Sequence, residues 1–423
     1  MEKIKSLIAR KIFDSRGYPA LAVRVEGPRG VMGEASVAAD YSWANSYGRN
    51  VSKEAEQKVA QAVADINKGL APEMTAGKFS GQADFDDWLE KYFAGRGLEP
   101  FSYAVSLAFA RLAANAEKLE LFLYLRNVFG LEGRPKSLPL PLFTMFNGGL
   151  IADTNLDFQE FLFVPKRRSP ALLRQDGEIN ETYACVNLAA AVYRELGQVL
   201  QEAGYDSDIG AQGGYAPDMD SSLEALEMIM AAAARLDLEA GRDFGLGIDI
   251  GSFSLYDPES GRYLLSLDQA AFAKDDLAGI YESWFKDFPL VYLEDIFVGE
   301  QWEPWREATA SLGAGVILAG DELFDSRESR LREGIKQQAA NAIVVKPDKT
   351  GSLSAAFRLI SLAKRHGYGA VVSQRSSETN DDGLADIAVA FEAPFIKAGA
   401  MARGERVAKY NRLLEIAAKL SSI

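Results

Sequence analysis

The feature that most constrains the fold of this 423-residue chain is a regular alternation that begins after residue 141. Short apolar segments typical of buried strands are followed by longer segments in which apolar residues recur every three or four positions, as in amphipathic helices. The strand-like segments are 159–164, 244–250, 291–295, 315–321, 342–346, 369–373 and 394–397, and the helical ones are 181–203, 220–237, 268–286, 352–366 and 403–420. This alternation predicts a parallel sheet, and about eight strand–helix units favour a closed (β/α)8 barrel over an open sheet.

The first third of the chain has a different pattern. Residues 20–25 are strand-like, a glycine turn follows at 27–30, and residues 53–72 and 100–130 have a helical period. A proline-rich segment at 134–141 joins the two parts. The sequence therefore predicts an α/β protein with an N-terminal α+β domain at 1–134 and a barrel domain, carrying the functional site, at 135–423.

Composition excludes several classes of protein. The formal net charge is −14, and no run of basic residues is longer than 166–168, so no nucleic-acid partner is expected. No segment approaches the roughly 18 apolar residues of a membrane span, and the first residues do not resemble a signal peptide. The single cysteine, Cys185, lies in an apolar helical pattern and is interpreted as a buried thiol. We therefore expect a cytoplasmic protein without a membrane partner.

The histidine content narrows the chemistry. The only histidine, His366, precedes a glycine at the predicted end of a helix, which indicates a capping or surface position. Hydrolysis by a Ser-His-Asp triad and histidine-rich zinc chemistry are therefore excluded. Any acid–base catalysis must use carboxylates, lysines or tyrosines.

Charged residues end six consecutive predicted strands. Because the C-terminal ends of barrel strands meet on one face, where active sites form, these side chains are expected to share one mouth. They are Asp249, Glu294, Asp321, Lys346, Arg375 and Lys397.

The residue types suggest a reaction. Asp249, Glu294 and Asp321 are hard oxygen ligands on neighbouring strands, which favours Mg²⁺. A nearby dication and burial both favour a neutral amine, so Lys346 is a candidate base. Arg375 and Lys397 would hold an anionic substrate. Together they predict removal of a proton α to a carboxylate, the chemistry for which a lysine base and Mg²⁺ are one known arrangement.

The chain resembles the enolase family nearly end to end. The matching motifs lie at 9–17, 147–149, 159–161, 213–217, 293–295, 320–323, 373–376, 396–400 and 405–414. The resemblance implies a small N-terminal domain packed on a modified barrel, usually as a homodimer. It also implies the roles of site residues: Mg²⁺ on Asp249, Glu294 and Asp321, Lys346 as base, Arg375 and Ser376 on a phosphate, Lys397 on a carboxylate, and Gln159 and Glu160 lining the pocket.

The differences from the family pattern fall in the same pocket. Gln212 stands where the family has its glutamate general acid, and an amide cannot protonate a leaving hydroxide. Gln374 replaces a histidine and Ala211 an aspartate. Residues 150–153 replace a histidine loop, and 38–43 align with the serine loop that helps bind a second Mg²⁺.

Three interpretations remain open from the sequence. The first is a Mg-dependent enzyme that forms a metal-stabilised enediolate from a phosphoglycerate-like or phosphonate-like carboxylic acid, with Lys346 as base. It then eliminates a better leaving group or transfers the intermediate, as carboxyphosphonoenolpyruvate synthase would do by analogy. The second is a phosphopyruvate hydratase in which Glu160, Asp153 or Asp40 replaces the acid. The third is a non-catalytic scaffold, against which the retained acidic trio and Lys346 argue.

Overall fold

The computed structural model describes residues 4–39, 51–167, 169, 181–299 and 301–421. The chain forms two compact units. The first unit comprises Met1–Leu138, Val345–Leu362 and Val372–Ala393, and the second comprises Pro139–Val344, Ala363–Val371 and Pro394–Ile423. The predicted division at residue 134 remains a prediction.

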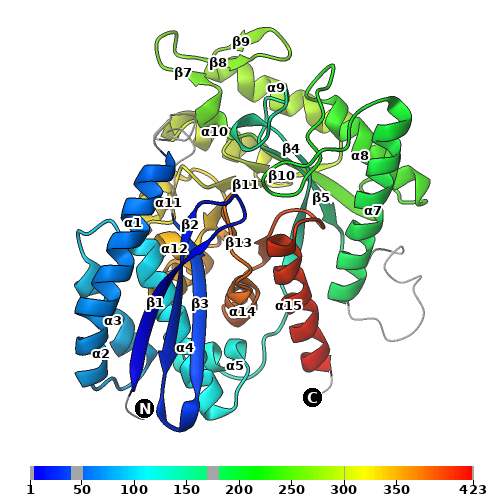
Figure 1. The fold of residues 1–423 in the computed structure, drawn as a ribbon. Helices are drawn as coiled ribbons and strands as arrows, with labels where there is room; N and C mark the ends of the chain where they lie inside the picture. The colour runs from blue at the N-terminus through cyan, green and yellow to red at the C-terminus, as the bar shows by residue number, and fades with distance from the viewer. Residues whose placement is uncertain (1–3, 40–50, 168, 170–180, 300, 422–423) are drawn as a thin grey trace. The chain divides into compact units, whose positions relative to one another are not determined.

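The first unit is built on an antiparallel sheet of β1 (Ser6–Phe13), β2 (Pro19–Glu26) and β3 (Met32–Ala38) (Figure 1). The sheet packs on the long helix α4 (Glu99–Glu117). A Cβ atom at Gly33 would lie 2.0 Å from the carbonyl oxygen of Ala108 and 2.3 Å from the amide of Leu112. Only glycine therefore lets β3 approach α4 so closely.

Some helices of this unit fall in the predicted segments, whereas α3 (Gln82–Phe93), α12 (Pro347–Thr350) and α14 (Gly383–Ala390) were not predicted. The segment predicted at 100–130 is two helices, because the chain turns at Lys118, whose φ is +56°. The left-handed residue ends the helical hydrogen-bond pattern there. The helices of this unit are α1 (Val51–Asp65), α2 (Ala71–Ala76), α3 (Gln82–Phe93), α4, α5 (Leu121–Val128), α12 (Pro347–Thr350), the start of α13 (Leu353–Arg365) and α14 (Gly383–Ala390).

A closed eight-stranded barrel confirms the predicted fold class. The strand order is β10-β11-β12-β13-β14-β4-β5-β6. Seven strands match predicted segments to within about two residues, whereas the sequence analysis identified no strand at β4. The bounds are β4 (Leu140–Asn147), β5 (Glu160–Pro165), β6 (Phe244–Asp249), β10 (Leu290–Glu294), β11 (Ile317–Gly320), β12 (Ala342–Val345), β13 (Gly369–Ser373) and β14 (Phe395–Lys397).

The prediction of a purely parallel sheet was wrong at one strand. β5 pairs antiparallel with both β4 and β6, whereas β6 and β10 are parallel. The connection from β4 to β5 contains only a short 3-10 turn, Gly149–Ile151. A parallel pair needs a crossover, usually a helix, so this short connection makes the two strands antiparallel.

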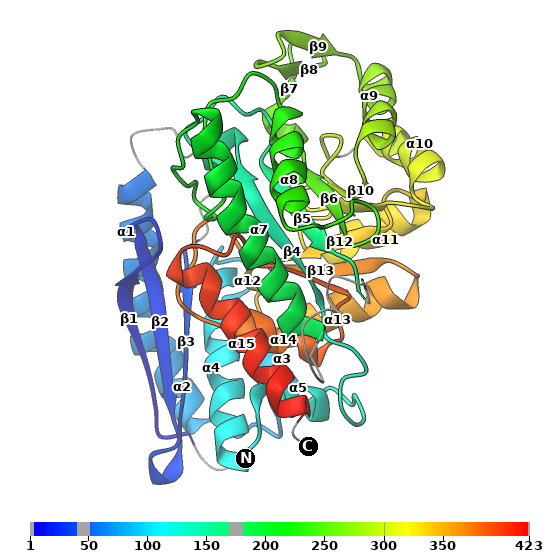
Figure 2. The ribbon, with the colours of Figure 1, turned by 90° about the vertical axis from the view of Figure 1, so that its right-hand side faces the viewer.

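Helices of the second unit lie around the barrel. Figure 2 shows α15 (Gly404–Ser421) alongside α7 (Glu181–Ala203). The others are α8 (Glu224–Arg235), α9 (Lys274–Asp287), α10 (Trp302–Leu312) and α11 (Glu328–Gln337). The segment predicted as a helix from residue 268 instead begins with β9 (Ala270–Phe272), which joins β7 (Tyr256–Asp257) and β8 (Arg262–Leu265) in a small sheet. Cys185 is buried in α7, as predicted.

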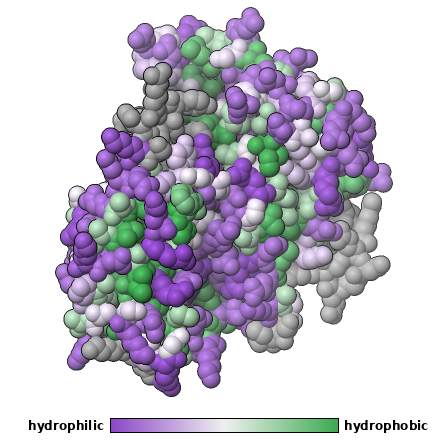
Figure 3. Space-filling model, in the orientation of Figure 1, coloured by the Kyte–Doolittle hydropathy of each residue, from purple (hydrophilic) through white to green (hydrophobic). Residues whose placement is uncertain are grey.

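Side chains from most of the barrel strands fill its interior. The core includes Leu142, Leu162, Tyr292, Val344 and Val371, all fully buried. On the outside, polar residues dominate the face shown in Figure 3, with apolar ones between them. Phe13 on β1 is the most exposed large apolar side chain in the described part of the chain, at 63%, and Ile8 on the same strand is also exposed, at 53%. Among the described residues, no helix is both long and apolar enough to cross a bilayer.

Candidate active site

Four charged side chains of the second unit meet at one end of the barrel. Asp249, Glu294 and Lys397 are the last residues of β6, β10 and β14. Glu160 is the first residue of β5, and since β5 is antiparallel to its neighbours, its start lies at the end of β6. The register places Glu160 beside Asp249, and Asp249 beside Glu294. These four residues are called the Lys397 cluster.

The ammonium group of Lys397 contacts all three carboxylates of the cluster. Its Nζ lies 2.8 Å from Glu160 Oε2 and 3.0 Å from Asp249 Oδ2. It also donates to both oxygens of Glu294, at 2.8 and 2.7 Å. All four residues are buried, with Glu160 and Glu294 at 0% exposure. One cation is thus enclosed by three anions in a medium of low dielectric constant, where each contact is strong.

Neighbouring hydroxyl groups fix the carboxylates further. Thr144, on β4, donates to Glu160 Oε1 at 3.1 Å. The hydroxyl of Tyr292, inside the barrel, donates to Glu294 Oε2. Such donors fix the orientation of the carboxylates.

The protonation equilibria reflect the crowding. Burial raises the pKa of Asp249 to about 6, although the Lys397 ammonium acts in the opposite direction. Burial and the nearby Asp249 carboxylate raise the pKa of Glu294 well above its usual value. For Lys397, burial disfavours the charged form, but the Asp249, Glu160 and Glu294 carboxylates outweigh it and raise the pKa. The cluster therefore favours additional positive charge.

A second acidic group lies at the end of β11. Asp295 leaves β10 with φ +48°, and its carboxylate accepts the backbone amides of Asp321 at 2.8 Å and Glu322 at 3.1 Å. Ligand atoms of Asp249, Glu294 and Asp295 lie within 4.8 Å of one another, as do those of Asp295, Asp321 and Glu322. The predicted metal trio thus falls into two overlapping groups that share Asp295. Sequence reasoning gave Asp295 no role, although its position directly after Glu294 was a usable signal.

The loop that carries Gln212 is held through its backbone. Asn147, the last residue of β4, accepts the amides of Gln212 and Gly214, both at 3.1 Å. The carbonyl of Gln212 accepts from the amide of Ala400 at 2.9 Å. Arg406 donates to the carbonyl of the preceding Ala211 at 3.0 Å. Gln212 is itself buried, so it occupies a fixed position on the second unit.

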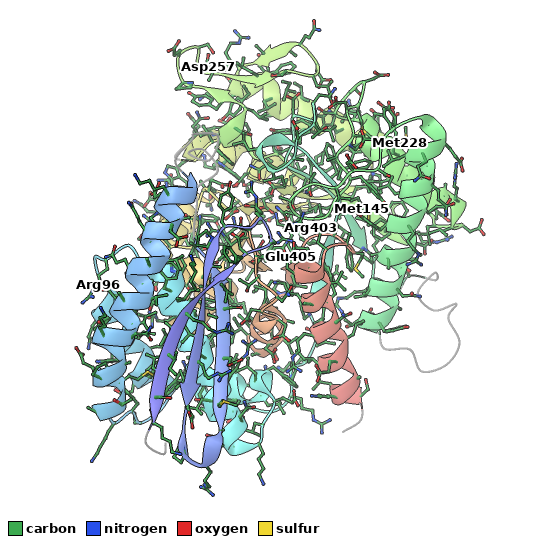
Figure 4. All side chains as sticks on the ribbon, in the orientation of Figure 1. Arg96, Met145, Met228, Asp257, Arg403 and Glu405 are labelled. Carbon is green, nitrogen blue, oxygen red and sulfur yellow. The ribbon has the colours of Figure 1, made fainter. Side chains whose placement is uncertain are left out.

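Arg406 in turn belongs to a charged group at the start of α15. Figure 4 labels Arg403 and Glu405 there, and these two form an ion pair at 2.8 Å. Glu405 also lies 3.3 Å from Arg406, which is fully buried. Sequence reasoning missed Arg406 and Asn147 as residues that position the loop, because their partners are backbone atoms from distant segments.

Backbone hydrogen bonds hold Gln159 beside the Lys397 cluster, and Gly251 leaves room for its side chain. Its backbone amide donates to the carbonyl of Asp249 at 3.0 Å, and its carbonyl accepts from Gly148 at 2.9 Å. A Cβ at Gly251 would lie 2.3 Å from Gln159 Nε2. Gly251 also has φ +58°, so glycine is needed there for two reasons.

The remaining predicted site residues, Lys346, Gln374, Arg375 and Ser376, belong to the first unit and are described within it. Lys346 directly precedes α12. Arg375 Nη1 lies 3.3 Å from Asp348 Oδ2, and its amide donates to Glu378 at 2.8 Å. Burial lowers the pKa of Arg375 to about 10, and burial together with Glu378 raises the pKa of Asp348 to about 7. Asp348 is a further residue that sequence reasoning missed.

Two models of known protein families match this chain. The model described as "Enolase, N-terminal domain" matches residues 4–125, and "Enolase, C-terminal TIM barrel domain" matches residues 135–423. The chain belongs to the enolase family. Together with the acidic groups at the barrel end, this membership supports an enzyme of the enolase superfamily.

The residues present fit the metal that the enolase family uses. Every candidate ligand is a carboxylate oxygen, the donor type preferred by hard divalent cations. Three carboxylates and one ammonium give the Lys397 cluster a formal charge of −2, which a dication would neutralise. The unusually high carboxyl pKa values point to the same need for positive charge.

The candidate substitute acids have different surroundings. Glu160 is buried, with one oxygen at Lys397 and the other at Thr144. Asp153 is exposed. Asp40 and most of the loop at 38–43 lie outside the described residues.

Proposed function

We propose that this enolase-family protein is a Mg²⁺-dependent enzyme that removes the α-proton of a small carboxylic acid bearing a phosphate or phosphonate group. The enolase family acts on small anionic acids. The observation that carries the proposal is the buried Lys397 cluster with its adjoining acidic group at the end of the barrel. A structural core has no use for three buried carboxylates around one cation, because their burial costs free energy.

In the proposed reaction, Mg²⁺ would be held by Asp249, Glu294 and Asp321, with Asp295 as an additional candidate. Bound there, the metal would supply positive charge opposite the substrate carboxylate. Lys346 breaks the C–H bond by taking the proton on Nζ, and the electron pair remains on the acid. Arg375 and Ser376 hold the phosphate or phosphonate, and Asp348 orients the Arg375 guanidinium for that contact.

Gln212 argues for a reaction other than loss of hydroxide. Its amide cannot supply a proton to a poor leaving group, and general acid catalysis contributes roughly 10²–10⁴-fold in rate. The rigid backbone of the Gln212 loop supports a binding role for this amide. We therefore propose that the carbanion expels a group that leaves as a stable anion, or is transferred to an electrophile. The homodimer and cytoplasmic location that the sequence suggested remain predictions.

The test is incubation with 2-phosphoglycerate and Mg²⁺ in D₂O, followed by NMR. Exchange of the C2 proton without phosphoenolpyruvate would support a working base and metal without the acid. Rapid formation of phosphoenolpyruvate would instead establish a hydratase with a substitute acid. Lys346→Ala should abolish exchange, and exchange that survives this substitution would contradict the role of Lys346.

A further inference from the structure

The position of Lys397 has a consequence for metal binding. Its Nζ lies within 3.0 Å of carboxylate oxygens from Asp249 and Glu294, two of the candidate metal ligands. Two cations sharing these oxygens at such distances repel each other strongly. A divalent ion that binds both carboxylates therefore competes with the ammonium for Glu294, both of whose oxygens Nζ contacts, and repels it from Asp249.

Glu160 provides the displaced ammonium with a partner. It is buried, lies 2.8 Å from Nζ, and is oriented by Thr144 through its other oxygen. It stands outside the predicted metal trio and the acidic groups that can hold a metal. An ammonium that moves away from Asp249 and Glu294 can thus remain paired with Glu160, without being left uncompensated in the interior.

We propose that Lys397 is an internal counter-cation that competes with the divalent metal for Asp249 and Glu294, and that Glu160 retains it when the metal binds. This inference rests on the metal site of the proposed function. Lys397 then sets the metal affinity, keeping it below what three buried carboxylates would otherwise give. It also stabilises the empty site, since the cluster is never without a cation.

The direct test is calorimetric titration of the full-length protein with MgCl₂, comparing wild type with Lys397→Met. We expect the variant to bind Mg²⁺ at least about tenfold more tightly, within the range usual for coupled sites. In EDTA the variant should melt at a lower temperature than wild type, and Mg²⁺ should raise its melting temperature by more. Lys409→Met is the matched control, because Lys409 is another buried lysine whose Nζ donates to the carbonyl of Glu405 at 2.9 Å. Its Mg²⁺ affinity should equal that of wild type.

Glu160→Gln tests whether Glu160 retains the displaced ammonium, and it leaves Lys397 in place. It also provides a test if the Lys397→Met variant fails to fold. The variant should bind Mg²⁺ more weakly, because the ammonium has lost its alternative partner. In Lys397→Met the same substitution should have a smaller effect, as a double-mutant cycle would show. An equal effect in both backgrounds would reduce Glu160 to a simple charge contribution and overturn its proposed role.

The outcomes separate this inference from the proposed function. Mg²⁺ binding of equal strength in wild type and Lys397→Met would overturn the competition and leave the metal site intact. Binding to Lys397→Met alone would support the competition but contradict a Mg²⁺-dependent wild-type enzyme. Absence of binding in both would overturn the two together.

Discussion

Two buried charge networks in this molecule are built in opposite ways. In the first unit, Arg111 of α4 pairs with both oxygens of Asp381, at 2.7 and 2.9 Å, and with Asp382 at 2.7 Å. Burial favours the neutral acid of Asp381, but Arg111 and the amides of Gly383 and Ser36 hold its pKa below the usual value. In the Lys397 cluster, the same physical forces leave the carboxyl pKa values of Asp249 and Glu294 raised.

The difference distinguishes a network that stabilises a fold from one arranged to bind. Around Asp381, donors match acceptors in number and direction, so its ionised form is favoured. Around Lys397, three carboxylates share one ammonium, and the excess negative charge remains. The excess negative charge lowers the stability of the fold, and binding of a cation would offset this loss. Such a trade-off between stability and function is common in proteins. Four substitutions or conditions test this comparison, in order of expected effect.

Asp249→Asn should produce the largest change in metal affinity. It removes a charged ligand from the site, so we expect Mg²⁺ affinity to fall by more than about 100-fold, beyond the usual effect of losing an outer-shell partner. Stability in EDTA should stay within about 1 kcal/mol of wild type, since Glu160 and Glu294 still pair with Lys397. Calorimetry and urea unfolding measure the two quantities. A large loss of stability with unchanged affinity would reverse the assignment of this cluster as a binding site.

Arg111→Met should give the opposite pattern. It leaves Asp381 buried without its guanidinium, and breaking a buried pair in this way costs about 3–5 kcal/mol. Urea unfolding should detect that loss, while Mg²⁺ affinity measured on the folded protein should remain at the wild-type value. A stability change below about 1 kcal/mol would mean that the network contributes little to the fold.

Tyr292→Phe should have a moderate effect confined to the metal. The substitution removes the hydroxyl that donates to Glu294 while preserving the ring within the barrel core. Partners of this kind typically contribute about 10–100-fold in affinity. We expect a decrease near the lower limit, about tenfold in a Mg²⁺ titration. An unchanged affinity would show that the Tyr292 hydroxyl does not position Glu294 for the metal.

Asp86 is a third kind of buried carboxyl, which is held by several hydrogen-bond donors. Its oxygens accept from Gln82, Ser106 and both the amide and hydroxyl of Ser354. Burial raises its pKa from 3.8 to about 6. Because the folded pKa exceeds the unfolded one, its protonation stabilises the fold at low pH, and this stability is lost as pH rises through 6.

The expected size is about 1.4 kcal/mol more stability at pH 5 than at pH 7 from this residue, since one pKa unit corresponds to about 1.4 kcal/mol. Urea unfolding of wild type and Asp86→Asn at both pH values isolates the contribution, because other titrating groups are common to both proteins. Identical pH dependence in the two proteins would show that the hydrogen bonds cancel the effect of burial.

The barrel could be predicted because most of its strands leave a local pattern in the sequence. An apolar run that ends in a charged residue identifies Asp249 or Glu294 as a strand end without knowledge of the partner strand. The antiparallel β5 was not predicted, because its direction follows from the short connection after β4, whose own strand was missed. The break at Lys118 was missed for a similar reason, since periodicity carries no signal for a single left-handed residue.

The chemistry of the site was less predictable than the fold. A lysine at the end of β14 indicates an anion partner, but residue type cannot say whether that anion is a substrate or the carboxylates of the same cluster. Asp295 and Asp321 each directly follow a barrel strand, so their positions in the sequence look equivalent. Only the turn at Asp295 shows that its carboxylate accepts the backbone amide of Asp321. The roles of Arg406 and Asn147 depend on backbone partners far away in sequence, which no local pattern records.

The central claim is that a divalent cation binds at Asp249 and Glu294 in place of the Lys397 ammonium. A crystal structure of the protein soaked with Mn²⁺, with anomalous diffraction data, tests it most directly. The account predicts an anomalous peak at coordination distance, about 2.2 Å, from both carboxylates, with Lys397 Nζ withdrawn toward Glu160. A peak elsewhere, or Lys397 still in contact with Asp249 and Glu294 at saturating metal, would contradict it.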